Sequence, residues 1–315
     1  MRRAVALAAG LALSACSVTV TPQPPVAAPA PVAPATVAGV PAGMQYLYGS
    51  GEAVAASRQA YDALAWFIWE SVTNHAKSLP ARPGLAPPAQ IEWQSVVLAP
   101  GSTLARPQPV ACAKRLPAIV LDVDETVLLN TGYEYADARG GLSYDAARWE
   151  RWERSDGRAT RAVPGAAEAL ARIRGLGVAV IFNSNRNAAT AAFTERALAA
   201  AGLGPARHGE TLFLRGDAPG GSAKDARRAT IAARYCVIAM AGDQLGDFSD
   251  LFNAGLKPAE RRAAADAAAI AGLWGRGWFI LPNPVYGPAL AGDFDDVFPN
   301  DLRWSDPGAA GNPRP

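Results

Sequence analysis

The sequence has little of several features that mark common protein classes. Only 18% of its 315 residues are charged, the net charge is +2 and no cluster of lysine and arginine occurs, so nothing indicates a nucleic-acid partner. It has only two histidines and three cysteines. The apolar run at residues 4–13 is too short to span a bilayer, which takes about 20 residues. With 50% hydrophobic residues, the chain can still bury a substantial core.

The N-terminal segment has the pattern of an export signal. Two arginines precede the apolar run, and residues 13–16 read Leu-Ser-Ala-Cys. This junction resembles a bacterial lipoprotein signal, in which Cys16 becomes the lipidated, palmitate-bearing first residue of the mature chain. Because Ser17 rather than aspartate follows, the resemblance implies an exported lipoprotein anchored in the outer membrane. The alternative is an ordinary signal peptide cleaved near Ala15.

Composition divides the chain into segments. Residues 1–15 are the expected signal peptide, and residues 16–43 are rich in proline and alanine and almost uncharged, which favours an extended tether. We expect a folded domain over residues 44–304 and a disordered tail over residues 305–315. Apolar positions at helical spacing predict a long amphipathic helix over residues 52–77.

Beyond this helix, short apolar runs alternate with helical segments. The predicted strands cover residues 116–122, 178–182, 211–214, 236–241 and 278–281, and the predicted helices cover residues 164–174, 187–201 and 224–233. This alternation predicts an α/β fold with a parallel sheet covered by helices on both faces. In such sheets ligands bind beyond the carboxyl ends of the strands, and the chemically suggestive clusters of this sequence lie there.

The first central strand ends in two carboxylates. Asp122 and Asp124 follow three apolar residues, and because alternate side chains in a strand share a face, both can point beyond the strand end. Two acids this close are costly unless positive charge neutralises them, which a cation together with a phosphate would do. The Asp-x-Asp-x-Thr pattern, completed by Thr126, resembles the first motif of the haloacid dehalogenase (HAD) superfamily of phosphotransferases.

Three further segments match the other motifs of this superfamily, in order and in strand context. They are Ser184, Lys224, and the pair Asp243 and Asp247. The resemblance implies that Asp122 is a nucleophile that forms an aspartyl phosphate, which splits one difficult hydrolysis into two easier steps. It makes Asp124 the general acid and base, and it places Ser184 and Lys224 on the phosphoryl oxygens.

The same resemblance implies a magnesium site. Mg²⁺ would be held by the Asp122 carboxylate, the backbone carbonyl of Asp124 and the Asp243 carboxylate, with water and phosphate completing an octahedron. Asp247 would support this loop.

Longer segments narrow the resemblance to the class C acid phosphatases. They are residues 119–133, 149–152, 161–166, 184–186, 242–248 and 283–287. This family includes bacterial outer-membrane lipoprotein 5'-nucleotidases, so it implies a Mg²⁺-dependent phosphomonoesterase that prefers nucleoside 5'-monophosphates. Gln244 and Gly246 depart from the family pattern, because Asn and Asp are common at these positions.

The class C resemblance also implies a small, mostly helical cap over the site, formed by about residues 129–162 together with the N-terminal helix. Trp149 and Tyr286 match positions that stack against a nucleobase or nicotinamide ring. The simpler interpretation of Trp149 and its neighbour Trp152 is packing between helices of the insert.

The two remaining cysteines precede two of the motif-bearing strands. In the HAD fold, the strands that end in Asp122 and Asp243 are parallel neighbours, so the resemblance places Cys112 and Cys236 together at the end opposite the site and implies a disulfide. The alternative is two reduced, buried cysteines that act as small apolar residues.

Several other functions are compatible with parts of the sequence. An Arg-His-Gly sequence at residues 207–209 matches histidine phosphatases, but it follows a turn, and the only other histidine, His75, lies earlier in the chain. A phosphotransferase or phosphomutase would use the same acids. A catalytically inactive surface-binding lipoprotein is the nonenzymatic alternative, and a homo-oligomer is compatible with the sequence.

Overall fold

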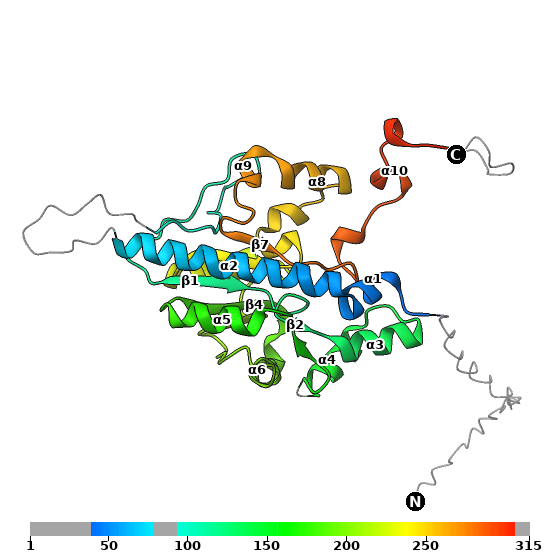
Figure 1. The fold of residues 1–315 in the computed structure, drawn as a ribbon, viewed down its shortest axis with the longest axis horizontal. Helices are drawn as coiled ribbons and strands as arrows, with labels where there is room; N and C mark the ends of the chain where they lie inside the picture. The colour runs from blue at the N-terminus through cyan, green and yellow to red at the C-terminus, as the bar shows by residue number, and fades with distance from the viewer. Residues whose placement is uncertain (1–38, 78–92, 156, 306–315) are drawn as a thin grey trace, which may run out of the picture. The chain divides into compact units, whose positions relative to one another are not determined.

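A computed structural model describes residues 39–77, 93–155 and 157–305 (Figure 1). Its centre is a five-stranded sheet in the order β5-β4-β1-β6-β7, in which every neighbouring pair is parallel. The strands are β1 (Pro117–Leu121), β4 (Ala179–Asn187), β5 (Leu212–Arg215), β6 (Cys236–Gly242) and β7 (Trp278–Ile280). The parallel α/β sheet predicted from the alternation of apolar runs and helices is confirmed.

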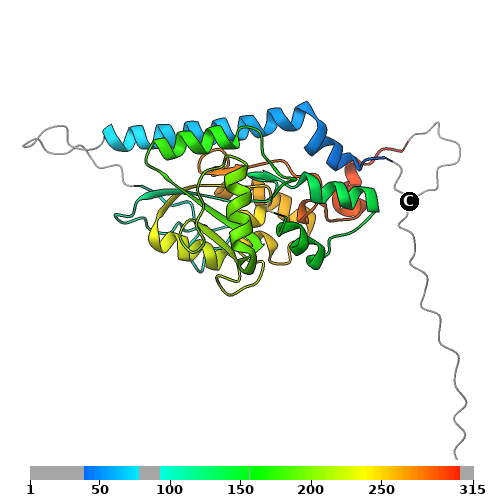
Figure 2. The same cartoon turned by 90° about the horizontal axis from the view of Figure 1, so that it is seen from below.

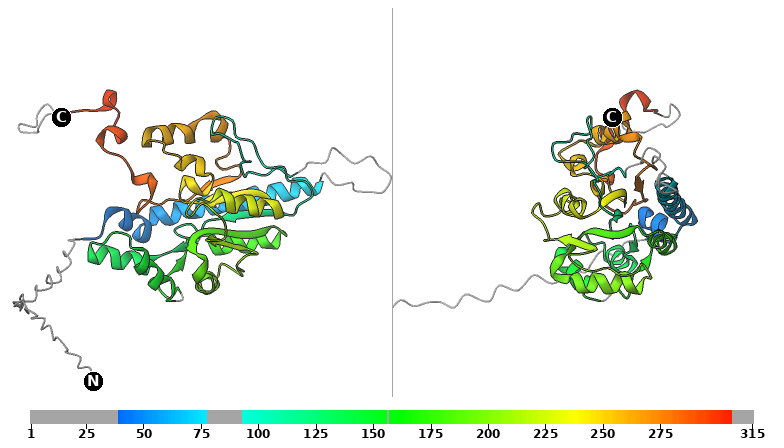
Figure 3. Two further views of the ribbon diagram at one scale, coloured as in Figure 1. Left: turned by 180° about the vertical axis from the view of Figure 1, so that it is seen from behind. Right: turned by 90° about the vertical axis from the view of Figure 1, so that its left-hand side faces the viewer.

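Helices cover both faces of this sheet. The described α-helices are α1 (Ala42–Met44), α2 (Gly51–Lys77), α3 (Thr131–Gly140), α4 (Ala146–Glu153), α5 (Ala166–Gly175), α6 (Ala191–Ala200), α7 (Asp225–Arg234), α8 (Pro258–Asp266), α9 (Ala268–Ala271) and α10 (Phe294–Val297). Figure 2 shows α2 lying alongside α5 on one face. On the opposite face lies α7, the yellow helix in Figure 3.

The residues of β1 show why both faces are covered. Ile119 and Leu121 pack into the cluster that includes α2 and α5, whereas Ala118 and Val120 pack into the cluster that includes α7. Side chains of a strand alternate between its faces, so an uninterrupted apolar run buries residues on both sides at once. This buried strand fixes the position of the residues that follow Leu121.

The long N-terminal helix begins one residue before its predicted start and ends at Lys77 as expected. Its buried side is apolar, and Leu64 and Ile68 are at most 1% exposed. The Tyr61 hydroxyl, also on this side, donates a hydrogen bond to the backbone carbonyl of Thr126 at 2.5 Å. The helix therefore braces the loop that follows β1.

An insert lies between β1 and α5, where the cap was expected. Strands β2 (Leu128–Leu129) and β3 (Arg161–Ala162) pair antiparallel, and α3 and α4 lie between them. Asp145 caps α4 by accepting a hydrogen bond from the Arg148 backbone N–H at 2.7 Å. The paired strands hold the two ends of the insert together.

A disulfide joins Cys112 to Cys236, which are 124 residues apart in sequence. Pro117 of β1 pairs with Cys236 of β6, so the bridge lies at the amino ends of these strands, away from Asp122. In the chain-entropy model, closing a loop of this length stabilises the fold by about 5 kcal/mol.

Some predictions fall on residues outside the described ranges. These include the signal peptide, Cys16, most of the proline-rich tether, and the tail from residue 306. The described chain becomes helical at Ala42, two residues before the predicted domain boundary. Among the described helices, none combines the length and the hydrophobicity needed to span a bilayer.

Candidate active site

A cleft of about 710 Å³ opens at the carboxyl ends of the strands. Its lining includes Asp122 after β1, Arg186 on β4, Arg215 at the end of β5 and Asp243 after β6. The insert contributes Trp149 to the same cleft. The topology of the sheet thus brings together side chains that are far apart in sequence.

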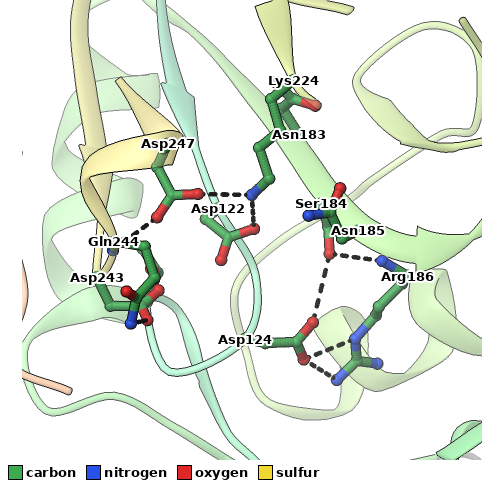
Figure 4. A network of polar contacts seen from close by, with 12 residues as sticks. Asp122, Asp124, Asn183, Ser184, Asn185, Arg186, Lys224, Asp243, Gln244 and Asp247 are labelled. Atoms are coloured by element: carbon green, nitrogen blue, oxygen red, sulfur yellow. Dashed lines mark hydrogen bonds and ion pairs between the residues drawn. The ribbon is translucent and has the colours of Figure 1, made fainter. Parts of the chain in front are cut away.

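Asp122 lies against a buried lysine. The Lys224 ammonium group donates hydrogen bonds to Asp122 at 2.5 Å and to Asp247 at 2.7 Å (Figure 4). Lys224 directly precedes α7, and its backbone N–H donates to Asp250, which fixes the start of that helix. Burial raises the pKa of Asp122 well above its usual value. The charge of Lys224 lowers this pKa, whereas the carboxylates of Asp247 and Asp243 raise it further.

Three carboxylates gather at this point. One oxygen each of Asp122, Asp243 and Asp247 lie within 4.8 Å of one another. Burial, followed by the charge of Asp247, raises the pKa of Asp243 to about 7. Lys224 supplies a single positive charge for this group, so a divalent cation would relieve the remaining repulsion. Carboxylate oxygens are the ligands that Mg²⁺ prefers, and the donor set therefore fits a hard divalent metal.

The loop after β6 holds Asp243 and Asp247 in place. The Gln244 side chain donates to the Asp243 carboxylate at 3.1 Å and to the backbone carbonyl of Tyr286 at 3.2 Å. A Cβ at Gly246 would lie 2.3 Å from the Asn253 amide nitrogen, so a larger residue there would require the Asn253 side chain to move. Gln244 thus helps to hold Asp243, and Gly246 leaves room for the Asn253 side chain.

Asp124 does not join the carboxylate cluster. Its carboxylate accepts hydrogen bonds from Arg186 at 2.8 and 2.9 Å and from Asn130 at 2.8 Å, and the Ser184 hydroxyl lies 3.4 Å away (Figure 4). Both acids line the cleft beyond β1, as expected, but their carboxylates have different partners. Strand β1 ends at Leu121, so the period of two does not extend to Asp124.

Several residues that organise the site were not assigned a role from the sequence. Arg186 is 2% exposed and orients Asp124, and Arg227 is 1% exposed and donates to Asn183 and Asn185 at 2.7 and 2.6 Å. Figure 4 shows both asparagines beside Ser184. The cluster of polar residues at the end of the β4 run was the available signal, because ligands bind beyond the carboxyl ends of parallel strands.

Thr126 also belongs to the site. Its hydroxyl donates to Asp243 at 2.7 Å, which ties the β1 loop to the β6 loop. Next to it, Glu125 is 1% exposed, has a φ of 53° and accepts hydrogen bonds from the hydroxyls of Tyr48 and Tyr286. Burial, with the charge of Asp124, raises the pKa of Glu125 to about 8.

The predicted stacking residues line the cleft. The Trp149 indole N–H donates to Glu153 at 2.7 Å, and its ring packs edge-on against Tyr133. Tyr286 is 37% exposed, and its hydroxyl is held by Glu125. Trp152 packs against Tyr133 and does not line the cleft, in agreement with the packing interpretation for that residue.

Comparison with known proteins identifies the family. Residues 93–289 match the model of the HAD superfamily, subfamily IIIB (acid phosphatase). The chain belongs to this family. As a HAD acid phosphatase it is a phosphomonoester hydrolase.

Solved structures show the same fold. The class C acid phosphatase from Bacillus anthracis aligns with a TM-score of 0.59 and 22% identity, over 78% of this chain and 84% of that chain. The structure of the class C acid phosphatase from Bacillus anthracis with tungstate bound aligns with a TM-score of 0.60 and 21% identity, over 84% of this chain and 96% of that chain.

The histidine-phosphatase alternative has no support in the fold. His208 does not line the cleft of this HAD acid phosphatase and instead contacts Asp217 at 2.8 Å. His75 stacks on Trp93, with ring centroids 4.3 Å apart. The two histidines are therefore held in separate parts of the structure.

Proposed function

We propose that this acid phosphatase is an exported, lipid-anchored enzyme that requires Mg²⁺ and prefers nucleoside 5'-monophosphates. The observation that carries the proposal is the position of Asp122, which lies at the tip of β1 against Lys224 and beside Asp243 and Asp247. The anchoring part of the proposal is supported by the lipoprotein-like sequence that ends at Cys16.

In the proposed reaction Asp122 attacks phosphorus. A bond forms between its carboxylate oxygen and phosphorus while the bond from phosphorus to the leaving oxygen breaks, and Asp124 gives that oxygen a proton. Asp124 then takes a proton from a water molecule as the water attacks the phosphoryl group, which frees Asp122. Both residues line the cleft, and Arg186 fixes the direction of the Asp124 carboxylate.

Lys224 and Ser184 would stabilise the phosphoryl group. Lys224 is 4% exposed and Ser184 is fully buried, so their donors are held in place before substrate arrives. Donors fixed in a site with little water stabilise developing negative charge more strongly than mobile ones do. The relative with bound tungstate, a tetrahedral oxyanion, supports a site of this kind in the same fold.

The metal would be held by Asp122, Asp243 and the backbone carbonyl of Asp124, with Asp247 completing the acid cluster. When bound, Mg²⁺ supplies positive charge to the phosphoryl oxygens and lowers the repulsion between them and the carboxylates. Thr126, Asn283 and Gln244 already donate to Asp243, so its oxygens are oriented by the protein itself.

The nucleotide preference would come from Trp149 and Tyr286. Both are aromatic, both line the cleft and both have a polar end held by a buried glutamate, which limits the orientations their rings can adopt. A base stacked on such a ring contributes about 1 to 3 kcal/mol, which sets a preference without excluding other phosphomonoesters.

A substrate panel tests the proposed catalysis. Adenosine 5'-monophosphate, nicotinamide mononucleotide and p-nitrophenyl phosphate are assayed with Mg²⁺ and with EDTA. We expect EDTA to abolish turnover of all three and Asp122→Asn to do the same, whereas Asp62→Asn, an exposed acid on α2, retains it. Turnover in EDTA, or by Asp122→Asn, would contradict the mechanism. Equal kcat/KM for all three substrates would contradict the nucleotide preference.

A labelling experiment tests the anchor separately. Cells that express the full chain are fed radiolabelled palmitate and fractionated. We expect label on the wild type in the outer membrane and none on Cys16→Ala. Label that persists in the variant would refute lipidation at this cysteine.

A further inference from the structure

The basic side chains of the cleft differ in how they are partnered. Lys224 bonds Asp122 and Asp247, and Arg186 bonds Asp124. The side chain of Arg215, the third basic residue of the lining, forms no ion pair or hydrogen bond with any described residue. It is therefore the one cation of the described cleft lining whose charge is not already used.

The surroundings of Arg215 make this unusual. Seven acidic side chains line the same cleft, yet none lies within ion-pair distance of Arg215. The acid nearest in sequence, Asp217, is held by His208 and by the backbone N–H of Leu214. The Arg215 side chain thus lines the cleft without an ion-pair partner among the residues that the structure describes.

The sheet topology places Arg215 on a definite side of the bound phosphoryl group. It is the last residue of β5 and pairs in register with Asn187 of β4. The reacting phosphate would lie at Asp122, directly after β1, which is two strands and about 10 Å from β5 in the sheet.

We infer that Arg215 binds a second phosphate, carried by the leaving group of the substrate. A phosphate held at Asp122 lies beyond the end of β1, whereas Arg215 ends β5, and a sugar or nucleoside that bears two phosphates can span that separation. The planar guanidinium fork matches phosphate oxygens and forms paired, charge-assisted hydrogen bonds. Among nucleoside 5'-phosphates, the preferred substrates would then be those that carry a second phosphate on the sugar.

This inference rests on the proposed function, because it assumes that the reacting phosphate lies at Asp122.

The test compares adenosine 3',5'-bisphosphate with adenosine 5'-monophosphate. Dissociation constants are measured by calorimetry in the Asp122→Asn background with Mg²⁺, so that no turnover occurs, and kcat/KM is measured in the otherwise wild-type enzyme. We expect about tenfold preference for the bisphosphate, the effect of a charge-assisted contact. Adding Arg215→Gln should reduce the preference to about one, Arg215→Lys should restore part of it, and the exposed control Arg276→Gln should leave it unchanged.

The readout is a ratio between two ligands in one variant, so any general loss of binding or folding cancels. An unchanged ratio in Arg215→Gln, or the absence of a preference in the parent, would overturn the inference. If the binding preference holds while neither compound is hydrolysed by the enzyme with Asp122 intact, the second-phosphate site stands and the proposed catalytic function fails.

Discussion

Asp243→Asn is expected to raise the unfolding free energy of the protein and to abolish its activity. Asp243 is 6% exposed, and burial together with the charge of Asp247 raises its pKa from 3.8 to about 7. The folded protein therefore holds this proton more tightly than the unfolded chain does. Wild-type stability should fall as the pH rises from about 4 to about 7 and should stay low above that range.

The size of the effect follows from two opposing changes. Ionising a group with this pKa costs the folded state about 4 kcal/mol at high pH, since each pH unit corresponds to 1.36 kcal/mol. Asparagine removes that cost, but its amide N–H₂ would meet a donor in either orientation, those of Asn283 and Gln244 or the Thr126 hydroxyl, which costs about 1 to 3 kcal/mol. We expect Asp243→Asn to gain about 1 to 3 kcal/mol in unfolding free energy at about pH 8 without metal.

Urea unfolding in EDTA and with Mg²⁺ measures this change, alongside turnover of p-nitrophenyl phosphate. Mg²⁺ should stabilise the wild type and the Asp62→Asn control but not Asp243→Asn, which should also be inactive. If Asp243→Asn is less stable than the wild type in EDTA at about pH 8, or responds to Mg²⁺ as the wild type does, the charge argument is wrong.

Three further predictions follow from single contacts. Replacing both Cys112 and Cys236 by serine should lower the unfolding free energy by about 4 to 5 kcal/mol in urea titrations, because the long loop between them is no longer closed. Trp149→Ala should lower kcat/KM for adenosine 5'-monophosphate about 5- to 100-fold, and lower it less for p-nitrophenyl phosphate, if the base stacks there. Burial, with the charge of Asp137, raises the pKa of Glu134 to about 7, so Glu134→Gln should be more stable than the wild type at about pH 8 by on the order of 1 to 3 kcal/mol and equal to it at about pH 4.

The parts of the fold that could be predicted are those that local patterns determine. Apolar runs identified all five parallel strands, because a strand buried on both faces cannot tolerate polar residues. The predicted parallel sheet also placed Asp122 and Asp243 at one edge, since the carboxyl ends of parallel strands share that edge.

The parts that could not be predicted depend on which partner each side chain meets. The sequence shows Asp122 and Asp124 as equivalent acids, yet one faces Lys224 and the other faces Arg186. That difference arises because the chain leaves the strand at Leu121 and turns through a positive φ at Glu125. No local pattern reports such a turn.

The sequence likewise could not show that the Arg215 side chain lacks an ion-pair partner among the described residues. An arginine at a strand end is common, and only the positions of the surrounding acids show that none of them pairs with it. The disulfide was accessible from the sequence through the resemblance, because strand adjacency in the family fold brings Cys112 and Cys236 together.

The central claim is that the Asp122 carboxylate accepts the phosphoryl group. Turnover of p-nitrophenyl phosphate with Mg²⁺ is stopped rapidly with acid, the acyl phosphate is reduced with borohydride, and the peptides are sequenced by mass spectrometry. We predict homoserine at position 122 in the wild-type enzyme during turnover, and none there when substrate is omitted. An unmodified Asp122 during steady turnover, or the modification at Asp124 or Asp243 instead, would contradict the mechanism.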